Sequence, residues 1–191
     1  RHLMELAEES NALVALKAHD SYHRPFFQLA RESADAISHT LDQAIDRGLV
    51  GFEHLFDRDY QPIEGTNPQK YTTRWDALCD ELLPPIQEPA LASRPEVIFV
   101  HACDDQGYVP THNKAFSQAL TGDYHHDLKF NRTKRLFNDR TGARAGENVE
   151  EMLLQTYKRD TGEVVHDLSV PIYVKGEHWG ALRVGYVPEG R

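Results

Sequence analysis

The side chains best suited to bind a ligand lie in one short basic stretch of an acidic chain. Between Lys129 and Gly146 the sequence reads KFNRTKRLFNDRTGARAG, with six basic residues and one acid, whereas the whole chain of 191 residues has a formal net charge of −9. Arginine holds a carboxylate through two parallel hydrogen bonds. The stretch therefore indicates either an anion-binding wall or a solvated loop whose charges offset the acidic remainder of the protein.

Within this stretch, Arg132 and Arg135 are the predicted ligand contacts. They lie about one helical turn apart, so their side chains can share a face. Phe130 and Phe137 lie nearby and can anchor the segment to an apolar core. An inward-pointing arginine needs a partner, because an unpaired buried charge is very costly. The other residues predicted to line the same site are Tyr157 and His112 as polar groups and Trp179 as an apolar wall.

The chain is rich in histidine, with 11 residues of this type. A metal site needs three or four converging ligands, and no HExxH motif is present. We expect His101 to be a core or edge histidine, whereas His112 ends a strand-like run beside the long polar region and is a better ligand contact. A b-type haem needs only one axial histidine. A haem or redox sensor with His112 as axial ligand is therefore the alternative to a cofactor-free domain.

Catalytic signatures are missing from the sequence. It contains no GxSxG motif and no P-loop. Asp104 and Asp105 lie close to His101 and could imitate an acid–base cluster, but they open the tetrapeptide DDQG, which is ordinary turn chemistry. The acidic balance argues against a nucleic-acid partner, since phosphate neutralisation needs a broad basic face. We therefore expect a binding protein and not an enzyme.

The two cysteines, Cys79 and Cys103, occur outside any CxxC motif. We expect both to be buried free thiols, as in a reducing compartment. The sequence shows no signal peptide and no apolar run long enough to cross a bilayer. These features favour a cytoplasmic location, with the periplasmic sensor of a membrane-anchored receptor as the alternative.

A long helix is expected to support this site from the N-terminal side. From Phe27 to Ala44 apolar residues recur at steps of three and four, which is a heptad pattern, and Gly48 supplies a stop. The seam either packs on the domain's own sheet or forms a coiled-coil dimer or signalling stalk. We predict a helical dimerisation unit over residues 1–48 and a sensor domain over residues 49–191.

The rest of the chain changes from helix to strand. A helix is expected from Pro68 to Leu82, with Pro84 ending it. Strand-like runs follow, separated by the turn sequences DDQG, TGE and KGEH. They occupy residues 96–103, 108–113, 153–160, 164–174 and 179–187. The predicted fold class is α+β, with long N-terminal helices packed on a five-stranded antiparallel sheet and a helix-and-loop insertion between its second and third strands.

Three segments carry a resemblance to a known family. They are YVPTHN, NRTKRLFNDRTG and LLQTYKRDTGEVVHDLSVPIYVKGEHWGALRVGY. Together they resemble the sensor region of a group of bacterial methyl-accepting chemotaxis proteins, over roughly Ile37 to Tyr186. Relatives often carry a cysteine near the position of Asn131, so any role of that cysteine is not carried over.

The resemblance implies a PAS-like fold of the single Cache type, with a small molecule bound between the sheet and the insertion. It also implies a function as the ligand-binding sensory domain of a chemotaxis transducer. The domain would form a homodimer through its helices, and the parent receptor would pass the signal to a chemotaxis histidine kinase and its coupling protein.

Overall fold

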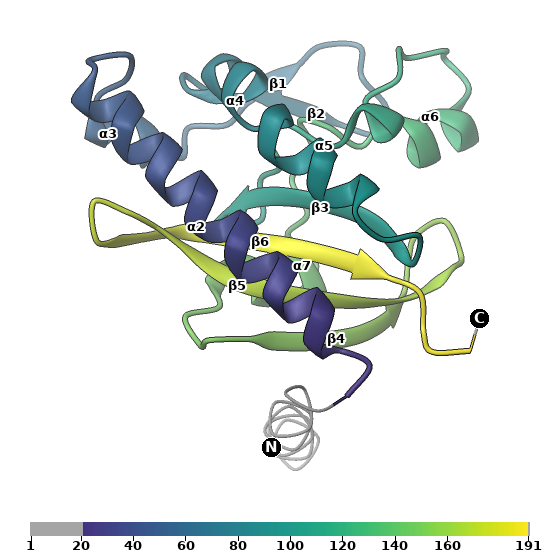
Figure 1. The fold of residues 1–191 in the computed structure, drawn as a ribbon. Coiled ribbons are helices and arrows are strands. Elements are labelled where there is room, and N and C mark those ends of the chain that lie inside the picture. Colours follow the sequence, from purple (N-terminus) through teal and green to yellow (C-terminus); the bar gives the residue numbers. More distant parts are fainter. Residues whose placement is uncertain (1–20, 191) are drawn as a thin grey trace, which may run out of the picture.

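The computed structural model describes residues 21–190, and the expected start of the dimerisation unit, residues 1–20, lies outside the described residues. The centre of the molecule is an antiparallel sheet of four strands in the order β3-β6-β5-β4 (Figure 1). The strands are β3 (Val97–Asp104), β4 (Leu153–Lys158), β5 (Val164–Val174) and β6 (Glu177–Tyr186).

Helices cover both faces of this sheet. The long helix α2 (Arg24–Asp46) contacts β5 and β6, and α5 (Pro84–Ala92) contacts β3 on the same side, whereas α7 (Arg140–Glu147) lies behind the sheet (Figure 1). The remaining elements are α3 (Phe52–Leu55), β1 (Gln61–Ile63), β2 (Lys70–Thr72), α4 (Asp76–Leu82), the 3₁₀ helix η1 (Lys114–Phe116) and α6 (Tyr124–Phe130).

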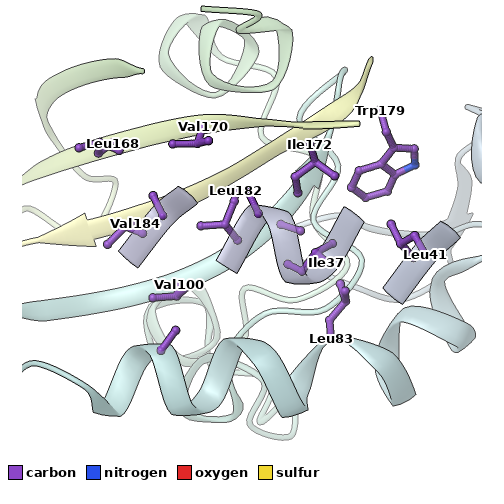
Figure 2. Packing of buried hydrophobic residues seen from close by; sticks show 14 of the residues in the cluster. Ile37, Leu41, Leu83, Val100, Leu168, Val170, Ile172, Trp179, Leu182 and Val184 are labelled. Atoms are coloured by element: carbon purple, nitrogen blue, oxygen red, sulfur yellow. The ribbon is translucent and has the colours of Figure 1, made fainter. Parts of the chain in front are cut away.

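The apolar seam of α2 packs on the domain's own sheet. Ile37 and Leu41 are fully buried, and Figure 2 shows them facing Leu182 and Ile172 of the sheet. Of the two interpretations of the heptad pattern, packing within the chain is therefore the one that the structure shows. The division of the chain at residue 48 stays a prediction.

The predicted five-stranded sheet is wrong by one strand. Residues 108–113 do not join the sheet, because they pair with the basic segment, which is defined as residues 129–146. The amide of Val109 donates to the carbonyl of Arg135 at 3.0 Å, and the amide of Lys134 donates to Val109 at 2.8 Å. Pro110 has no amide hydrogen and cannot extend the ladder. The segment expected as the second strand thus holds the basic segment in place.

The helix expected from Pro68 is also shorter than predicted. Residues 61–63 and 70–72 form a small antiparallel hairpin, β1-β2, and α4 begins only at Asp76. The carboxylate of Asp76 accepts a hydrogen bond from the amide of Thr73 at 2.9 Å, and this contact holds the chain at the start of the helix. Cys79 on α4 and Cys103 on β3 are buried and free, as predicted.

The strands divide their side chains between two very different environments. On β5, Leu168, Val170 and Ile172 face α2 in the main core, as the alternation predicted. Asp167 and Ser169 therefore point to the opposite face, and both are fully buried there. The face behind the sheet is thus covered and carries buried polar side chains beside a small apolar cluster of Cys103, Val109 and Ala181, which makes it the place to look for a site.

The burial of Ile37 yields a stability prediction. Ile37→Ala removes apolar volume from a closed core, so it should lower the free energy of unfolding by about 2–5 kcal/mol in chemical denaturation. The control Gln43→Ala, at an exposed position of the same helix, should change it by about 0.5 kcal/mol or less. The contrary result would be an Ile37→Ala variant with unchanged stability that no longer forms a dimer in sedimentation. It would show that the apolar seam of α2 packs between two chains.

Candidate anion-binding site

A cavity of about 350 Å³ lies on the face of the sheet opposite α2. Its floor is formed by side chains of β3 and β6, its roof by the basic segment and the start of α7, and one wall by the end of β4 with the turn that follows. Residues from distant parts of the chain therefore meet there, through the strand register and through the pairing of residues 108–113 with the basic segment.

The floor contains a buried ion pair between Arg183 of β6 and Asp167 of β5. Arg183 Nε lies 3.0 Å from Asp167 Oδ2, and Nη2 contacts the same carboxylate. Tyr157 of β4 donates its hydroxyl hydrogen to Asp167 at 2.7 Å and accepts from Arg183 Nη2 at 3.1 Å. Burial acts to lower the pKa of Arg183, but the Asp167 carboxylate outweighs it and holds this pKa well above its usual value. The charge of Arg183 is thus compensated within the protein.

The roof places two arginines on one carboxylate. Arg132 Nη1 lies 2.8 Å from Asp160 Oδ1, and Arg135 Nη2 lies 3.2 Å from Asp160 Oδ2. Both guanidinium groups also lie over the ring of Phe137, at 5.1 and 4.6 Å from its centroid. Burial acts to raise the pKa of Asp160, but the two arginines outweigh it and lower that pKa. The single carboxylate of Asp160 is thus shared by two guanidinium groups.

Two guanidinium groups retain unused hydrogen-bonding capacity. Nη1 of Arg135 is buried without a partner among the described residues. The guanidinium of Arg159 lies over the rings of Phe99 and Phe116, at 5.4 and 5.6 Å from their centroids. Arg159 is 9% exposed, and its side chain forms no hydrogen bond or ion pair within residues 21–190. Burial, followed by the nearby charge of Arg132, lowers the pKa of both Arg135 and Arg159.

The cavity therefore carries an excess of positive charge. Its walls hold five cations and two carboxylates, and Asp167 behind Arg183 supplies a third carboxylate, so this set of residues carries two more positive than negative charges. The cations are Arg132, Arg135, Lys158, Arg159 and Arg183, and the two carboxylates of the wall belong to Asp139 and Asp160. Such a wall favours a negatively charged ligand over a positively charged one.

Two neutral histidines complete the lining. The rings of His101 and His112 lie 4.4 Å apart between centroids, and both residues are buried. Burial lowers the pKa of each well below its usual value, and the arginines around the cavity add to the effect. Both side chains are therefore uncharged at neutral pH and act as hydrogen-bonding groups.

Four of the five residues predicted for the site meet in this cavity, namely Arg132, Arg135, Tyr157 and His112. Trp179 lies instead in the main core on the other side of the sheet (Figure 2), where its ring packs 5.3 Å from that of Trp75. Its indole nitrogen donates to the carbonyl of Leu55 at 2.8 Å. The apolar surfaces of the cavity come from Phe99, Leu136 and Phe137.

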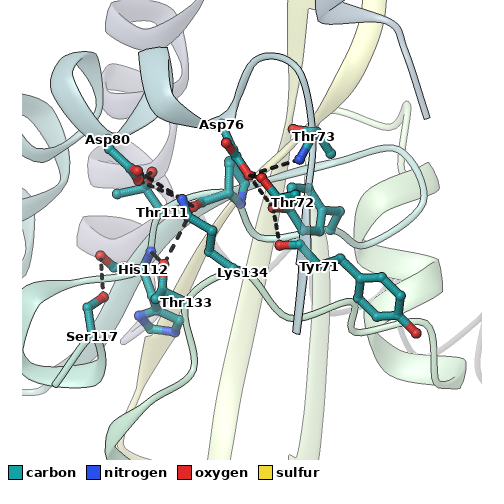
Figure 3. Close-up of polar contacts among 12 residues, drawn as sticks. Tyr71, Thr72, Thr73, Asp76, Asp80, Thr111, His112, Ser117, Thr133 and Lys134 are labelled. Carbon is teal, nitrogen blue, oxygen red and sulfur yellow. Dashed lines mark hydrogen bonds and ion pairs between the residues drawn. The ribbon is translucent and has the colours of Figure 1, made fainter. Parts of the chain in front are cut away.

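The remainder of the basic segment has other contacts. Lys134 Nζ lies 2.8 and 2.9 Å from the two carboxylate oxygens of Asp80 on α4 and 2.7 Å from the carbonyl of Pro110 (Figure 3). The same network fixes His112, whose amide donates to Thr133 Oγ1 at 3.1 Å. Arg140 is exposed. The segment is thus part cavity wall and part surface, and its role in anion binding stays a prediction.

Sequence reasoning missed several members of the site. Arg159 and Asp160 occupy the end of a predicted strand, and His101 was assigned to the core. Asp167 and Arg183 had a usable signal, because each is a charged residue that alternates with the core-facing positions of its strand and so points away from the main core. Their pairing depends on the register of β5 with β6, which a single sequence does not reveal.

The described residues also constrain other chemistry. Within residues 21–190 no group of three or more His, Cys, Asp or Glu side chains is placed to hold a metal ion. In the same part of the chain, no helix is long and apolar enough to cross a lipid bilayer. The arrangement supplies charge-assisted hydrogen-bond donors, which suit the oxygens of an anion.

Comparisons with known proteins leave the family open. Neither the models of known protein families nor the curated proteins give a match. Among solved structures, the chain is similar to an extracellular ligand-binding receptor from Desulfohalobium retbaense, at 15% sequence identity and a TM-score of 0.43. The match covers 84% of this chain and 25% of the receptor chain. A similarity of this degree carries no argument about function, so the functional case rests on the cavity.

The buried ion pair of the floor yields a second prediction. Asp167→Asn leaves the Arg183 charge buried without its partner, so it should lower the free energy of unfolding by about 3–5 kcal/mol. The control Asp46→Asn alters the ion pair with Lys175, in which the side chains are 65% and 36% exposed, and it should cost about 1 kcal/mol or less. Denaturation curves that shift equally for the two variants would contradict the difference in burial.

The histidines yield a prediction on pH. Their pKa values lie below the unfolded value of about 6.5, so the unfolded state binds more protons as the pH falls from about 6.5 toward the folded pKa. Stability should therefore be fully present above this window and fall within it, by up to about 1.4 kcal/mol per pH unit for each histidine. His112→Asn should flatten the slope relative to His39→Asn, which changes an exposed histidine. Equal slopes would count against the neutral buried state of His112.

Proposed function

We propose that this chain is a sensory domain that binds a small anion in the cavity behind its sheet and does no chemistry on it. The observation that carries the proposal is the excess of positive charge around this cavity, with Nη1 of Arg135 buried there without a partner among the described residues. An unpartnered buried donor, such as Nη1 of Arg135, costs free energy that a ligand oxygen would recover. Donors without a partner are therefore suited to a ligand that carries at least one anionic oxygen.

The dimensions of the cavity support a small ligand. Its volume of about 350 Å³ falls at the lower end of the roughly 300–1,000 Å³ typical of ligand pockets. Guanidinium groups match carboxylates in geometry, and the rings of Phe99 and Phe137 offer apolar contacts for a short carbon skeleton. A small organic carboxylate meets both requirements.

The place of the domain in a receptor is proposed from the sequence resemblance. The segments that resemble chemotaxis sensor regions are also those that wall the cavity: Arg132 and Phe137 come from one of them, and Tyr157 and Arg183 from another. We therefore propose a single Cache type module of a chemotaxis transducer, cytoplasmic, with a periplasmic location as the alternative.

Signalling would then run through the helices. A homodimer formed by N-terminal helices would pass the change through the parent receptor to the chemotaxis histidine kinase and its coupling protein. The ligand can shift such an equilibrium only through unequal affinity for two states. Supporting the proposal, the strands that form the cavity floor carry on their other face the side chains that pack against α2.

A haem sensor with His112 as axial ligand belongs to a different class. The amide of Asn113 donates to Nδ1 of His112 at 2.8 Å, which leaves only Nε2 for a metal. Charged groups dominate the surrounding wall, and no apolar surface of porphyrin size is part of the cavity lining. Visible haem bands in the absorption spectrum of the purified protein would favour this alternative over an organic anion.

The proposal predicts arginine-dependent binding. In a thermal-shift screen of small carboxylates and inorganic phosphate, a bound anion should raise the melting temperature. In calorimetry, Arg135→Ala and Arg159→Ala should each weaken binding of the best anion by about 1.5–3 kcal/mol, or about ten- to a hundredfold, because each removes a charge-assisted contact. The control Arg140→Ala removes an exposed arginine of the same segment and should leave affinity within about twofold.

Two results would contradict the proposal. One is a screen in which no small anion shifts the melting temperature. The other is an anion whose affinity is the same for wild type, Arg135→Ala and Arg159→Ala, since it would bind somewhere other than this cavity.

A further inference from the structure

The hydrogen bonds of the two cavity histidines fix which nitrogen of each ring carries the proton. Nδ1 of His112 accepts from the amide of Asn113 at 2.8 Å, so in the neutral ring the proton lies on Nε2. Nδ1 of His101 lies 3.3 Å from the carbonyl oxygen of Ala102, which can only accept, so its proton lies on Nδ1 and Nε2 keeps its lone pair. The pair therefore presents one donor and one acceptor.

Neither Nε2 atom has a hydrogen-bond partner among the described residues, and both residues line the cavity. Their ring centroids lie 4.4 Å apart, so the two rings are direct neighbours in the cavity wall and one ligand can contact both. Water or a ligand must supply the missing contacts, because an unpaired polar atom away from solvent is costly.

The same aromatic ring connects this pair to the uncompensated charge. His101 stacks on Phe99 with centroids 5.2 Å apart, and the guanidinium of Arg159 lies 5.4 Å from the centroid of that ring. The guanidinium of Arg159 and the histidine pair therefore border the same ring of the cavity wall, and one ligand that spans this ring can contact both. The ligand needs an anionic end and a neutral hydrogen-bonding substituent close to it.

We infer that the ligand is a hydroxycarboxylate whose hydroxyl donates to Nε2 of His101 and accepts from Nε2–H of His112, an inference that rests on the proposed anion-binding function. A hydroxyl satisfies both histidines at once. A keto oxygen accepts from His112 but leaves His101 unpaired. An ammonium group donates to His101 only, and it adds a positive charge beside a wall that already carries more positive than negative charges. A hydrogen atom satisfies neither ring.

Four acids with one carbon skeleton test this order on the wild-type chain. Lactate, pyruvate, alanine and propionate differ only in the substituent next to the carboxylate. Calorimetry should find lactate tightest, by about ten- to a hundredfold over propionate, with pyruvate between them and alanine weakest. Malate against succinate repeats the comparison on a four-carbon skeleton and should give the same sign.

Variants assign the preference to the histidines. His112→Phe keeps an aromatic ring beside Phe116 but removes the donor, and His101→Phe removes the acceptor. Each should abolish the preference for lactate over propionate while propionate affinity stays within about threefold. Arg159→Ala should weaken all of the carboxylates together. If neither histidine variant folds, the wild-type series alone decides.

The outcomes separate the inference from the function on which it rests. If propionate binds as tightly as lactate and succinate as tightly as malate, the hydroxyl inference is overturned while anion binding stands. If none of the six acids binds but inorganic phosphate does, the cavity takes an anion of another class and the inference is again overturned. If no anion binds, both the hydroxyl inference and the proposed anion-binding function are overturned.

Discussion

The buried ion pair of Arg183 with Asp167 is the interaction on which the arrangement of the site depends. Two charges taken out of water are tolerated only when each is fully satisfied, and here a carboxylate, a guanidinium and the Tyr157 hydroxyl satisfy one another across β4, β5 and β6. The pair fixes a polar floor on one face of a sheet whose other face is apolar. It also engages the guanidinium of Arg183, whereas Arg135 and Arg159 keep donors without a partner among the described residues.

Much of the local structure could be predicted from the sequence, because it follows from short-range pattern. The alternation along β5 correctly separates Leu168 and Val170 from Asp167, and the seam of α2 is correctly apolar. The error at residues 108–113 arises because a strand-like pattern does not say which strand it pairs with, and the partner here is the basic segment. Secondary structure was therefore predictable to the extent that neighbours in the sequence determine it.

The site was predictable only where one segment determined it. Arg132 and Arg135 followed from the charge of a single stretch, and they share Asp160 as their close spacing allows. Trp179 was misplaced because its face is decided by packing against Trp75, about a hundred positions away along the chain. The Asp167 pairing and the charge surplus need the complete sheet register, and no pattern within one strand contains that information.

Asp160 has a consequence that concerns the concentration range of a sensor. Its carboxylate occupies two arginines of the cavity, and it lies in the turn that joins β4 to β5. For the anion binding proposed above, it would act as a tethered competitor, with a local concentration that the turn sets and dilution cannot change. An incoming carboxylate that uses the same arginines must displace the carboxylate of Asp160 from them before it is bound. The length and stiffness of a surface turn, and not the shape of the cavity, would then set the threshold of the response, and a population of receptors could be retuned without altering what they recognise.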